Sequence, residues 1–301
     1  MGETMALVDP GGPIAYGCSL TLRMAGAESN VAIALRRLGV GVRWVSRLGS
    51  DPLGDLIADT LAAEGVDTSL VFRDPDAPTG LFIKLRTVSA TTVQYYRAGS
   101  AASRLRTGDV PDTALDGIEL VHLTGITMAL SASARETVVD VARRARARKT
   151  MVVFDPNWRP ALWATSDEAA SAFNEILPYA DWVLCGAEEG RILFGGTTPA
   201  ETIAKIRARG AGDAVVRIGA GGAQLLGPAG AITVAPAAMV DVVDEIGAGD
   251  AFAAGFEFGL LQALPPREAV VEANRIAAAA LTGTGDWETL PSLGAHSSRP
   301  A

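Results

Sequence analysis

Apolar and polar positions alternate along this chain in patterns typical of helices and of buried strands. From residue 27 to 39, apolar side chains recur every three or four positions, and Gly39 follows where a helix would end. Residues 42–48 form a short segment rich in branched and aromatic side chains. Asp51 and Pro52 then stand where a helix would be capped and begin. This order predicts a helix, a strand and a second helix.

The second half of the chain repeats the alternation of strand and helix. Strands are predicted at 119–125, 151–155, 182–185 and 214–219, and helices at 131–149 and about 169–177. Repeated units of this kind imply a parallel sheet with helices on both faces. We therefore expect an α/β fold.

One segment departs from this alternation. Residues 79–97 alternate apolar and polar positions on both sides of a turn at Ser89-Ala90, which predicts an antiparallel hairpin with one covered face. With a strand from about 14–25, this hairpin would form a small sheet that acts as a lid over a cleft. The alternative is an edge hairpin of the main sheet. No internal repeat or long linker divides the chain, so we expect a single domain over 1–301.

Composition and charge narrow the functional classes. Apolar residues make up 49% of the chain, yet no run approaches the length of about 18 that a membrane span needs. No secretory signal is evident, and Cys18 and Cys185 form no motif, so we expect a cytoplasmic protein without a membrane partner. The net charge of −8 argues against nucleic acid as a partner. The basic segment 143–149 lies on a predicted amphipathic helix and is interpreted as its solvated face.

The glycine-rich segment 244–256 is the strongest candidate for chemistry. Gly247 and Gly249 leave the backbone open to a ligand, and the apolar residues that follow predict a helix leaving the turn. The first N–H groups of such a helix favour anions such as phosphate. Asp250 would be repelled by phosphate, which suggests a base facing a substrate hydroxyl. A helix cap explains the same acid equally well at this point.

Five segments together resemble a known family, the ribokinase-like (PfkB-type) carbohydrate kinases. Residues 26–39 resemble the N-terminal glycine signature of that family, and 244–256 resemble its C-terminal signature with the catalytic acid, in the expected order and separation. Residues 94–103, 125–131 and 155–163 resemble the branch of 2-keto-3-deoxygluconate kinases in particular. The resemblance covers nearly the whole chain.

The resemblance implies both a fold and a reaction. The fold is the ribokinase-like three-layer α/β fold, with a mostly parallel central sheet flanked by helices and a small β lid. The reaction is the ATP-dependent, Mg²⁺-assisted phosphorylation of 2-keto-3-deoxygluconate to its 6-phospho form. Asp250 is implied as the base for the primary hydroxyl. The backbone amides of Gly247, Ala248 and Gly249 are implied as an anion hole for the transferred group.

Two arginines distinguish a site for an acid sugar from a site for a neutral one. A 2-keto-3-deoxy acid carries a carboxylate, and the guanidinium groups of Arg97 and Arg159 are suited to binding it in two places. The alternative is that both are surface arginines. By resemblance, four further residues lie at the sugar: Gly26, Asn30, Tyr95 and Asp286. The alternatives are a local cap for Asn30, lid packing for Tyr95 and a plain loop position for Asp286.

The nucleotide and metal side is implied by resemblance alone. The residues assigned to the nucleotide are Arg217, Gly219, Gly222 and Asn274. Asn274 has a capping or solvated role as its alternative. Glu189 is the candidate for Mg²⁺, through water, because Gly186 stands where the family commonly has an Asn three residues earlier. Phe82 replaces a tyrosine on the first lid strand, which removes one expected hydrogen bond to the sugar.

The start of the sequence also departs from the family. Relatives enter the fold through an apolar strand that leads into Gly-Glu, whereas Met1 directly precedes Gly2 and Glu3 here. We expect the first strand of the main sheet to be largely missing. Backbone groups and apolar surface would then be uncovered, so this chain is predicted to be less stable than one extended upstream by several strand residues.

Other functions are weighed against these residues. A kinase for another sugar would act on 2-keto-3-deoxygalactonate, fructose or a nucleoside, and a neutral substrate would not need Arg97 and Arg159. A non-catalytic sugar-acid sensor is suggested by Gly186 and by the short start, although the intact turn at 247–250 opposes it. A nicotinamide-dependent reductase would need Gly-x-Gly-x-x-Gly after the first strand, which this sequence lacks there. We expect a homo-oligomer paired through the apolar face of the lid.

Overall fold

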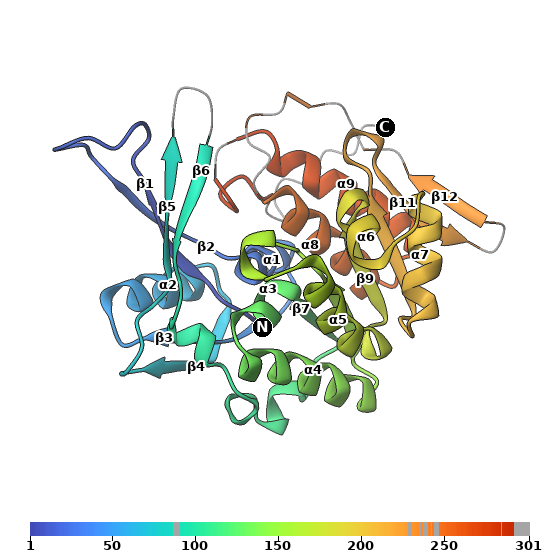
Figure 1. The fold of residues 1–301 in the computed structure, drawn as a ribbon, viewed down its shortest axis with the longest axis horizontal. Coiled ribbons are helices and arrows are strands. Elements are labelled where there is room, and N and C mark those ends of the chain that lie inside the picture. The colour runs from blue at the N-terminus through green and yellow to red at the C-terminus, as the bar shows by residue number, and fades with distance from the viewer. Residues whose placement is uncertain are drawn as a thin grey trace.

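Strands and helices alternate along most of the chain in the computed structural model (Figure 1). The structure describes residues 1–86, 91–227, 230–234, 236, 240, 241, 243, 247–283 and 285–291. Its strands are β1 (Met5–Asp9), β2 (Thr21–Ala25), β3 (Arg43–Gly49), β4 (Asp67–Asp74), β5 (Leu81–Arg86), β6 (Thr91–Tyr96), β7 (Leu120–Thr124), β8 (Met151–Asp155), β9 (Trp182–Gly186), β10 (Asp213–Arg217), β11 (Ala223–Gly227) and β12 (Gly230–Val234). Its α-helices are α1 (Ala27–Arg37), α2 (Pro52–Ala63), α3 (Gly125–Leu130), α4 (Ala132–Ala147), α5 (Ser166–Ile176), α6 (Ala187–Phe194), α7 (Pro199–Ala208), α8 (Ala248–Leu261) and α9 (Pro266–Ala280).

A six-stranded sheet in the order β12-β11-β10-β9-β8-β7 forms the centre of the molecule. The four strands from β7 to β10 pair in parallel, and β11 and β12 are antiparallel. Side chains of α4, α5, α6 and α7 form the core on one face of this sheet, whereas those of α1, α8 and α9 form the core on the other. Because both faces are covered, the inner strands are continuous apolar runs. The predicted three-layer α/β fold is confirmed.

A second, separate sheet of four strands has the order β2-β1-β5-β6 (Figure 1). Strands β2, β5 and β6 lie within the segments that the sequence suggested for the lid, whereas β1 was not predicted in it. β1 pairs in parallel with β5 and antiparallel with β2. The alternative of an edge hairpin on the main sheet is therefore wrong. The predicted turn at Ser89-Ala90 lies outside the described residues.

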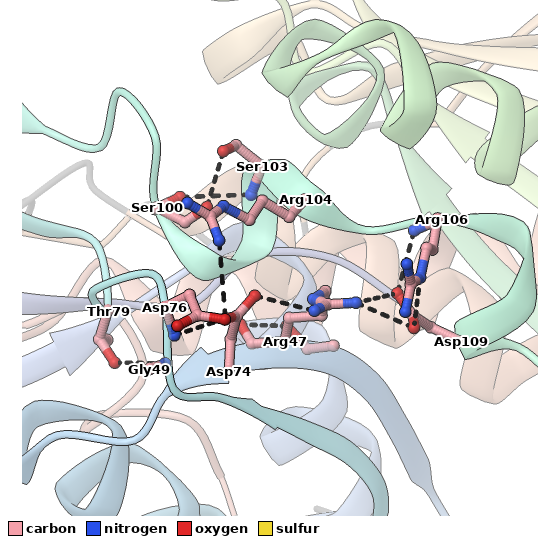
Figure 2. A network of polar contacts seen from close by, with 11 residues as sticks. Arg47, Gly49, Asp74, Asp76, Thr79, Ser100, Ser103, Arg104, Arg106 and Asp109 are labelled. Atoms are coloured by element: carbon pink, nitrogen blue, oxygen red, sulfur yellow. Dashed lines mark hydrogen bonds and ion pairs between the residues drawn. The ribbon is translucent and has the colours of Figure 1, made fainter.

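Strands β3 and β4 form a third, two-stranded parallel sheet, and a buried ion cluster ties it to the segment that follows the lid (Figure 2). The guanidinium of Arg47 in β3 lies 2.8 Å from a carboxylate oxygen of Asp74 and 2.8 Å from one of Asp109. All three side chains are almost fully buried. Removing one member of such a pair costs about 3–5 kcal/mol. The cluster therefore anchors η2 (Thr107–Asp109) against β3 and β4.

Local signals in the sequence place several helix ends as predicted. Asp51 caps α2 by accepting a hydrogen bond from the backbone N–H of Gly54, and Pro52 is the first helical residue. The basic segment 143–149 lies at the end of α4, and its arginines pair with surface aspartates such as Asp140 and Asp116. Over the part of the chain that the structure describes, none of the helices combines the length and apolar character needed to cross a bilayer.

Candidate active site

The carboxylate of Asp250 is held by two asparagine side chains from separate elements. Asp250 lies in the first turn of α8, and the Nδ2 group of Asn30, in α1, donates to its Oδ2 at 2.8 Å. The Nδ2 group of Asn157, which follows β8, donates to its Oδ1 at 3.2 Å. The carboxyl end of a parallel strand and the starts of two helices thus converge on one acid, where open α/β sheets bind ligands.

The turn before α8 admits only glycine at its first position. Gly247 has a φ of 79°, and a Cβ built on it would lie 2.2 Å from the backbone oxygen of Asp286. A Cβ on Gly249 would approach only the guanidinium of Arg217, at 3.7 Å. A side chain at Gly249 would therefore contact Arg217 without a clash. The N-cap of α8 is Gly247, which has no side chain and makes no side-chain capping hydrogen bond. Asp250 is therefore not the N-cap residue, and its carboxylate is held by the two asparagines.

The surroundings of Asp250 make it a stronger base than an ordinary aspartate. Burial raises its pKa from 3.8 to about 6. The hydrogen bond from Asn30 and the positive charge of Arg159 act in the opposite direction, whereas the charges of Asp155 and Asp286 raise the pKa further. A carboxylate with a pKa near 6 is ionised at neutral pH and still accepts a proton readily. Asp250 therefore has the properties of a general base.

Asn157 is a site residue that the sequence reasoning missed. Its backbone has a φ of 40°, which is uncommon for a residue other than glycine but tolerated by asparagine. Its backbone N–H donates to the carboxylate of Asp155 at 2.9 Å, and the resulting turn directs its amide to Asp250. The signal in the sequence was an Asp-Pro-Asn turn directly after a buried strand.

An ion cluster lies beside the start of α8. Arg217, at the end of β10, lies 2.9 Å from the carboxylate of Asp155 and donates to the backbone oxygen of Gly249 at 3.3 Å. Its guanidinium is 3.9 Å from Glu189. The carboxylate of Glu189 accepts backbone N–H groups from Gly186 and Trp158. Burial, and then the charge of Asp155, raises the pKa of Glu189.

The other residues assigned to the nucleotide lie at two places. Gly219 and Gly222 form the turn between β10 and β11, with φ values of 59° and 89° that favour glycine. A Cβ on Gly219 would meet nothing within 4 Å, so that turn is open on one side. Asn274 is buried on α9, and its Nδ2 group donates to the backbone oxygen of Val234 in β12 at 3.3 Å.

The lid brings its arginine to a buried glutamate that the sequence reasoning missed. Arg97 forms an ion pair with Glu3, whose side chain is fully buried, and the hydroxyl of Ser100 donates to the other carboxylate oxygen. The guanidinium of Arg97 lies 5.6 Å from the ring centroid of Tyr95. Gly26, the N-cap of α1, packs so closely that a Cβ would lie 2.4 Å from the backbone oxygen of Glu3.

The remaining sugar candidates are Tyr95 on β6, Asp286 after α9 and Arg159 after β8. Tyr95 packs against Phe82 with ring centroids 5.8 Å apart. Asp286 forms an ion pair of 3.2 Å with Lys84 of β5, so the lid is tied to the loop that follows α9. Arg159 is exposed. Asn30, Asn157, Arg159 and Asp286 are thus all brought to Asp250, by contact or by charge.

Comparison with known proteins finds relatives that match nearly the full length of this chain and that are both named as kinases of deoxy sugar acids. The chain is 36% identical to a 2-dehydro-3-deoxygluconokinase of Bacillus subtilis (strain 168), covering 96% of this chain and 91% of the relative. It is 34% identical to a 2-dehydro-3-deoxygalactonokinase of Haloferax volcanii, covering 95% of this chain and 91% of that protein. Its structure matches the crystal structure of a PfkB protein from Polaromonas sp. JS666 with a TM-score of 0.88 and 39% identity, covering 98% and 96% of the two chains.

A family model matches nearly the same extent of the sequence. The model of the pfkB family carbohydrate kinases matches residues 4–293, which include the lid, Asp250 and the turn before α8. Because the match spans most of the chain and agrees with the curated relatives and the fold, it settles the family. This chain belongs to the pfkB family of carbohydrate kinases.

Proposed function

We propose that this sugar kinase transfers the γ-phosphoryl group of ATP to the terminal hydroxyl of 2-keto-3-deoxygluconate and forms the 6-phospho product. The observation that carries the proposal is the carboxylate of Asp250, which Asn30 and Asn157 hold beside the glycine turn at 247–249. The relative in Bacillus subtilis, named for the same reaction, supports this substrate. The relative in Haloferax volcanii favours the C4 epimer, 2-keto-3-deoxygalactonate, as the second candidate.

In this proposal Asp250 accepts the proton of the sugar hydroxyl as phosphoryl transfer proceeds. Its pKa of about 6 keeps it ionised at neutral pH and suits it to hold that proton. Its two hydrogen bonds fix the direction of its oxygens. The backbone N–H groups of Gly247, Ala248 and Gly249, at the positive end of α8, stabilise the negative charge of the transferred group. Positioning and electrostatics account for most of the catalysis in reactions of this class.

Arg97 and Arg159 recognise the carboxylate of the substrate in this proposal. Arg159 is exposed and lies close enough to Asp250 for its charge to lower the pKa of that acid. Arg97 is oriented by Glu3, and Tyr95 lies against it. Guanidinium groups bind carboxylates with two parallel hydrogen bonds, which a neutral sugar cannot accept in the same way. Gly26, Asn30 and Asp286 complete the sugar side.

Nucleotide and Mg²⁺ are assigned to the side of the site near Arg217. The turn with Gly219 and Gly222 has open space at Gly219, as phosphate-binding turns require. Arg217 supplies a positive charge beside it. Asn274 is assigned to the adenine side. Mg²⁺ would neutralise phosphate charge when bound. Among the described residues, no three His, Cys, Asp or Glu side chains are grouped to hold a metal ion. Glu189 accepts two backbone N–H groups, so it suits a contact through water, as Mg²⁺ usually retains several waters.

The association state and compartment are part of the same proposal. Large apolar side chains are exposed on and near the lid strands: Ile14, Tyr16, Leu20, Leu22 and Tyr96. We assign this surface to a second copy of the chain, because apolar patches of this kind mark interfaces. Sedimentation analysis of the protein and of the Leu22→Glu variant tests it, since a monomer at micromolar concentration contradicts it. Cys18 and Cys185 are both free thiols, which agrees with our assignment to the cytoplasm, where disulfides are rare.

Coupled measurement of ADP release with a panel of acceptors tests the reaction. The panel contains 2-keto-3-deoxygluconate, 2-keto-3-deoxygalactonate, fructose, ribose and adenosine. We expect turnover of the acid sugars, its loss in Asp250→Ala, and a higher KM in Arg97→Ala. Arg143→Ala is the matched control, since that exposed arginine pairs, among the described residues, only with Asp140 on its own helix. Turnover that survives in Asp250→Ala contradicts the base, and an unchanged KM in Arg97→Ala contradicts the carboxylate clamp.

A further inference from the structure

The loop at residues 285–291, which follows α9, is attached to the lid by polar contacts. The carboxylate of Asp286 forms the ion pair of 3.2 Å with Lys84 of β5, and both side chains are at least nine-tenths buried. The indole N–H of Trp287 donates to the backbone oxygen of Met24 in β2, at 3.2 Å. The loop is therefore tied to two different strands of the lid sheet.

Asp286 also connects this loop to the candidate active site. A Cβ built on Gly247 would lie 2.2 Å from the backbone oxygen of Asp286, so the loop packs directly against the turn before α8. The negative charge of Asp286 raises the pKa of Asp250, which places its carboxylate within electrostatic reach of that acid. Any displacement of the loop would thus move a charged group beside Asp250.

The backbone of the loop is held by one arginine of the neighbouring helix. Arg37 is the last residue of α1, and its guanidinium lies 5.2 Å from the ring centroid of Trp287. Its Nη1 group donates to three backbone oxygens of the loop, those of Leu290 at 3.0 Å, Trp287 at 3.1 Å and Glu288 at 3.4 Å. A single side chain therefore fixes most of the loop.

The guanidinium of Arg37 is itself held in one orientation. Its Nε and Nη2 groups donate to the two carboxylate oxygens of Glu64, each at 2.9 Å. Two parallel hydrogen bonds fix the plane of a guanidinium, which leaves Nη1 directed at the loop. The side chain of Arg37 is only 16% exposed, so water competes little for these contacts. The arrangement is consequently rigid.

Helix α1 contributes to the candidate site from both of its ends. Asn30, in its first turn, donates to the carboxylate of Asp250. Arg37 lies about 10 Å further along the helix axis and holds the loop that carries Asp286. Because one rigid helix carries both contacts, it sets the separation between Asp250 and Asp286.

We propose that Arg37 is a positioning residue for sugar binding, which acts through the backbone of the loop 285–291. The proposal rests on the proposed function, in which Asp286 lies on the sugar side of the site. Arg37 keeps the carboxylate of Asp286 at the distance from Asp250 that the sugar requires. Groups that bind or react with a substrate must be held within a fraction of an ångström, and a displacement of about 1 Å costs up to about a hundredfold in rate.

Steady-state kinetics of Arg37→Met, with Arg36→Met as the matched control, test this role. Arg36 precedes Arg37 on the same helix, but its guanidinium donates to the backbone oxygens of Gly65 and Val40. In Arg37→Met we expect the KM for the acid sugar to rise about tenfold and the KM for ATP to stay within about twofold. A merely structural role would reduce the folded fraction, and hence kcat, without changing either KM. An unchanged sugar KM in Arg37→Met, or an equal rise in Arg36→Met, overturns the proposal.

A double-mutant cycle with Asp286→Ala tests whether Arg37 acts through that residue. Adding Arg37→Met to Asp286→Ala should raise the sugar KM no further, because the positioned group is already absent. A further rise of about tenfold overturns the proposal. If Asp286→Ala alone leaves the sugar KM unchanged, the sugar role of Asp286 is wrong and this inference fails with it. If Asp286→Ala raises the sugar KM and Arg37→Met does not, this inference alone is wrong.

A milder substitution keeps the proposal testable if Arg37→Met does not fold. Arg37→Lys retains a positive charge beside Glu64, but an ammonium group lacks the planar fork that reaches both Glu64 and the loop. We expect a rise of about threefold in the sugar KM, again with the KM for ATP unchanged. An unchanged sugar KM in this folded variant overturns the proposal.

Discussion

The pH dependence of catalysis should move when Asn30 is replaced by alanine. The surroundings of Asp250 raise its pKa from 3.8 to about 6, which corresponds to a cost of about 3 kcal/mol for the ionised form. The hydrogen bond from Asn30, at 2.8 Å, is the largest contribution that favours the ionised form. A hydrogen bond to a charged group contributes roughly 1.5–3 kcal/mol, and water and Asn157 replace part of it. We take about 1.5 kcal/mol, which is about one pH unit.

The sign of the change follows from which form is active. The base must be ionised, so kcat/KM rises with pH as Asp250 loses its proton. In the unmodified protein the acid limb of log kcat/KM should bend near pH 6. In Asn30→Ala it should bend near pH 7, by roughly one unit upward. Activity lost near pH 6 is then partly recovered near pH 8.5.

Initial rates of ADP formation from pH 5 to 9, at constant ionic strength and low sugar concentration, measure this shift. Asn174→Ala is the matched control, because Asn174 is exposed on α5. Its acid limb should coincide with that of the unmodified protein. An acid limb in Asn30→Ala that is unmoved, or that moves to lower pH, refutes the reasoning. An equal loss at every pH shows instead that Asn30 acts on the sugar and not on the base.

Three further predictions concern stability. The folded-state pKa of Asp250 is above its ordinary 3.8, so the ionised acid destabilises the fold above about pH 6, and this penalty fades as the pH falls towards 4. Asp250→Asn should therefore raise the free energy of urea unfolding by about 2 kcal/mol at pH 7.5 and by nearly nothing at pH 4. Equal gains at the two pH values contradict this. Gly247→Ala should lower the melting temperature and abolish turnover, because its Cβ has no space and its φ is 79°, whereas Gly219→Ala should cost only about 1 kcal/mol. Lys84→Met leaves the carboxylate of Asp286 without its buried cation and should lower the free energy of unfolding by about 3 kcal/mol. Adding Asp286→Asn in the same chain should recover part of that loss. Additive losses of the two substitutions in urea unfolding argue against the ion pair.

Much of the architecture follows from local patterns in the sequence. The strand at 151–155 and the helix that Asp51 and Pro52 begin were predicted where the structure has β8 and α2, because periodicity and capping act within a few residues. The lid strand β1 was missed. Five residues with only a partly buried pattern do not reveal which sheet they join.

The candidate site could be predicted only in part for the same reason. Gly247 and Asp250 are only three positions apart, so the turn could be identified from the local sequence pattern. Asn157 donates to an acid 93 residues away, and Lys84 pairs with one 202 residues away. No local pattern encodes such distances, because the chain topology determines which side chains meet.

The sequence by itself thus determined the alternation of strands and helices, the glycine turn and the presence of an acid at 250, all of which depend on chemistry within a few residues of the chain. Only the tertiary structure decided that Asn30 and Asn157 hold that acid, that burial raises its pKa to about 6, and that Glu3 orients Arg97. These properties arise from desolvation and from contacts between distant segments, which exist only after the layers have packed.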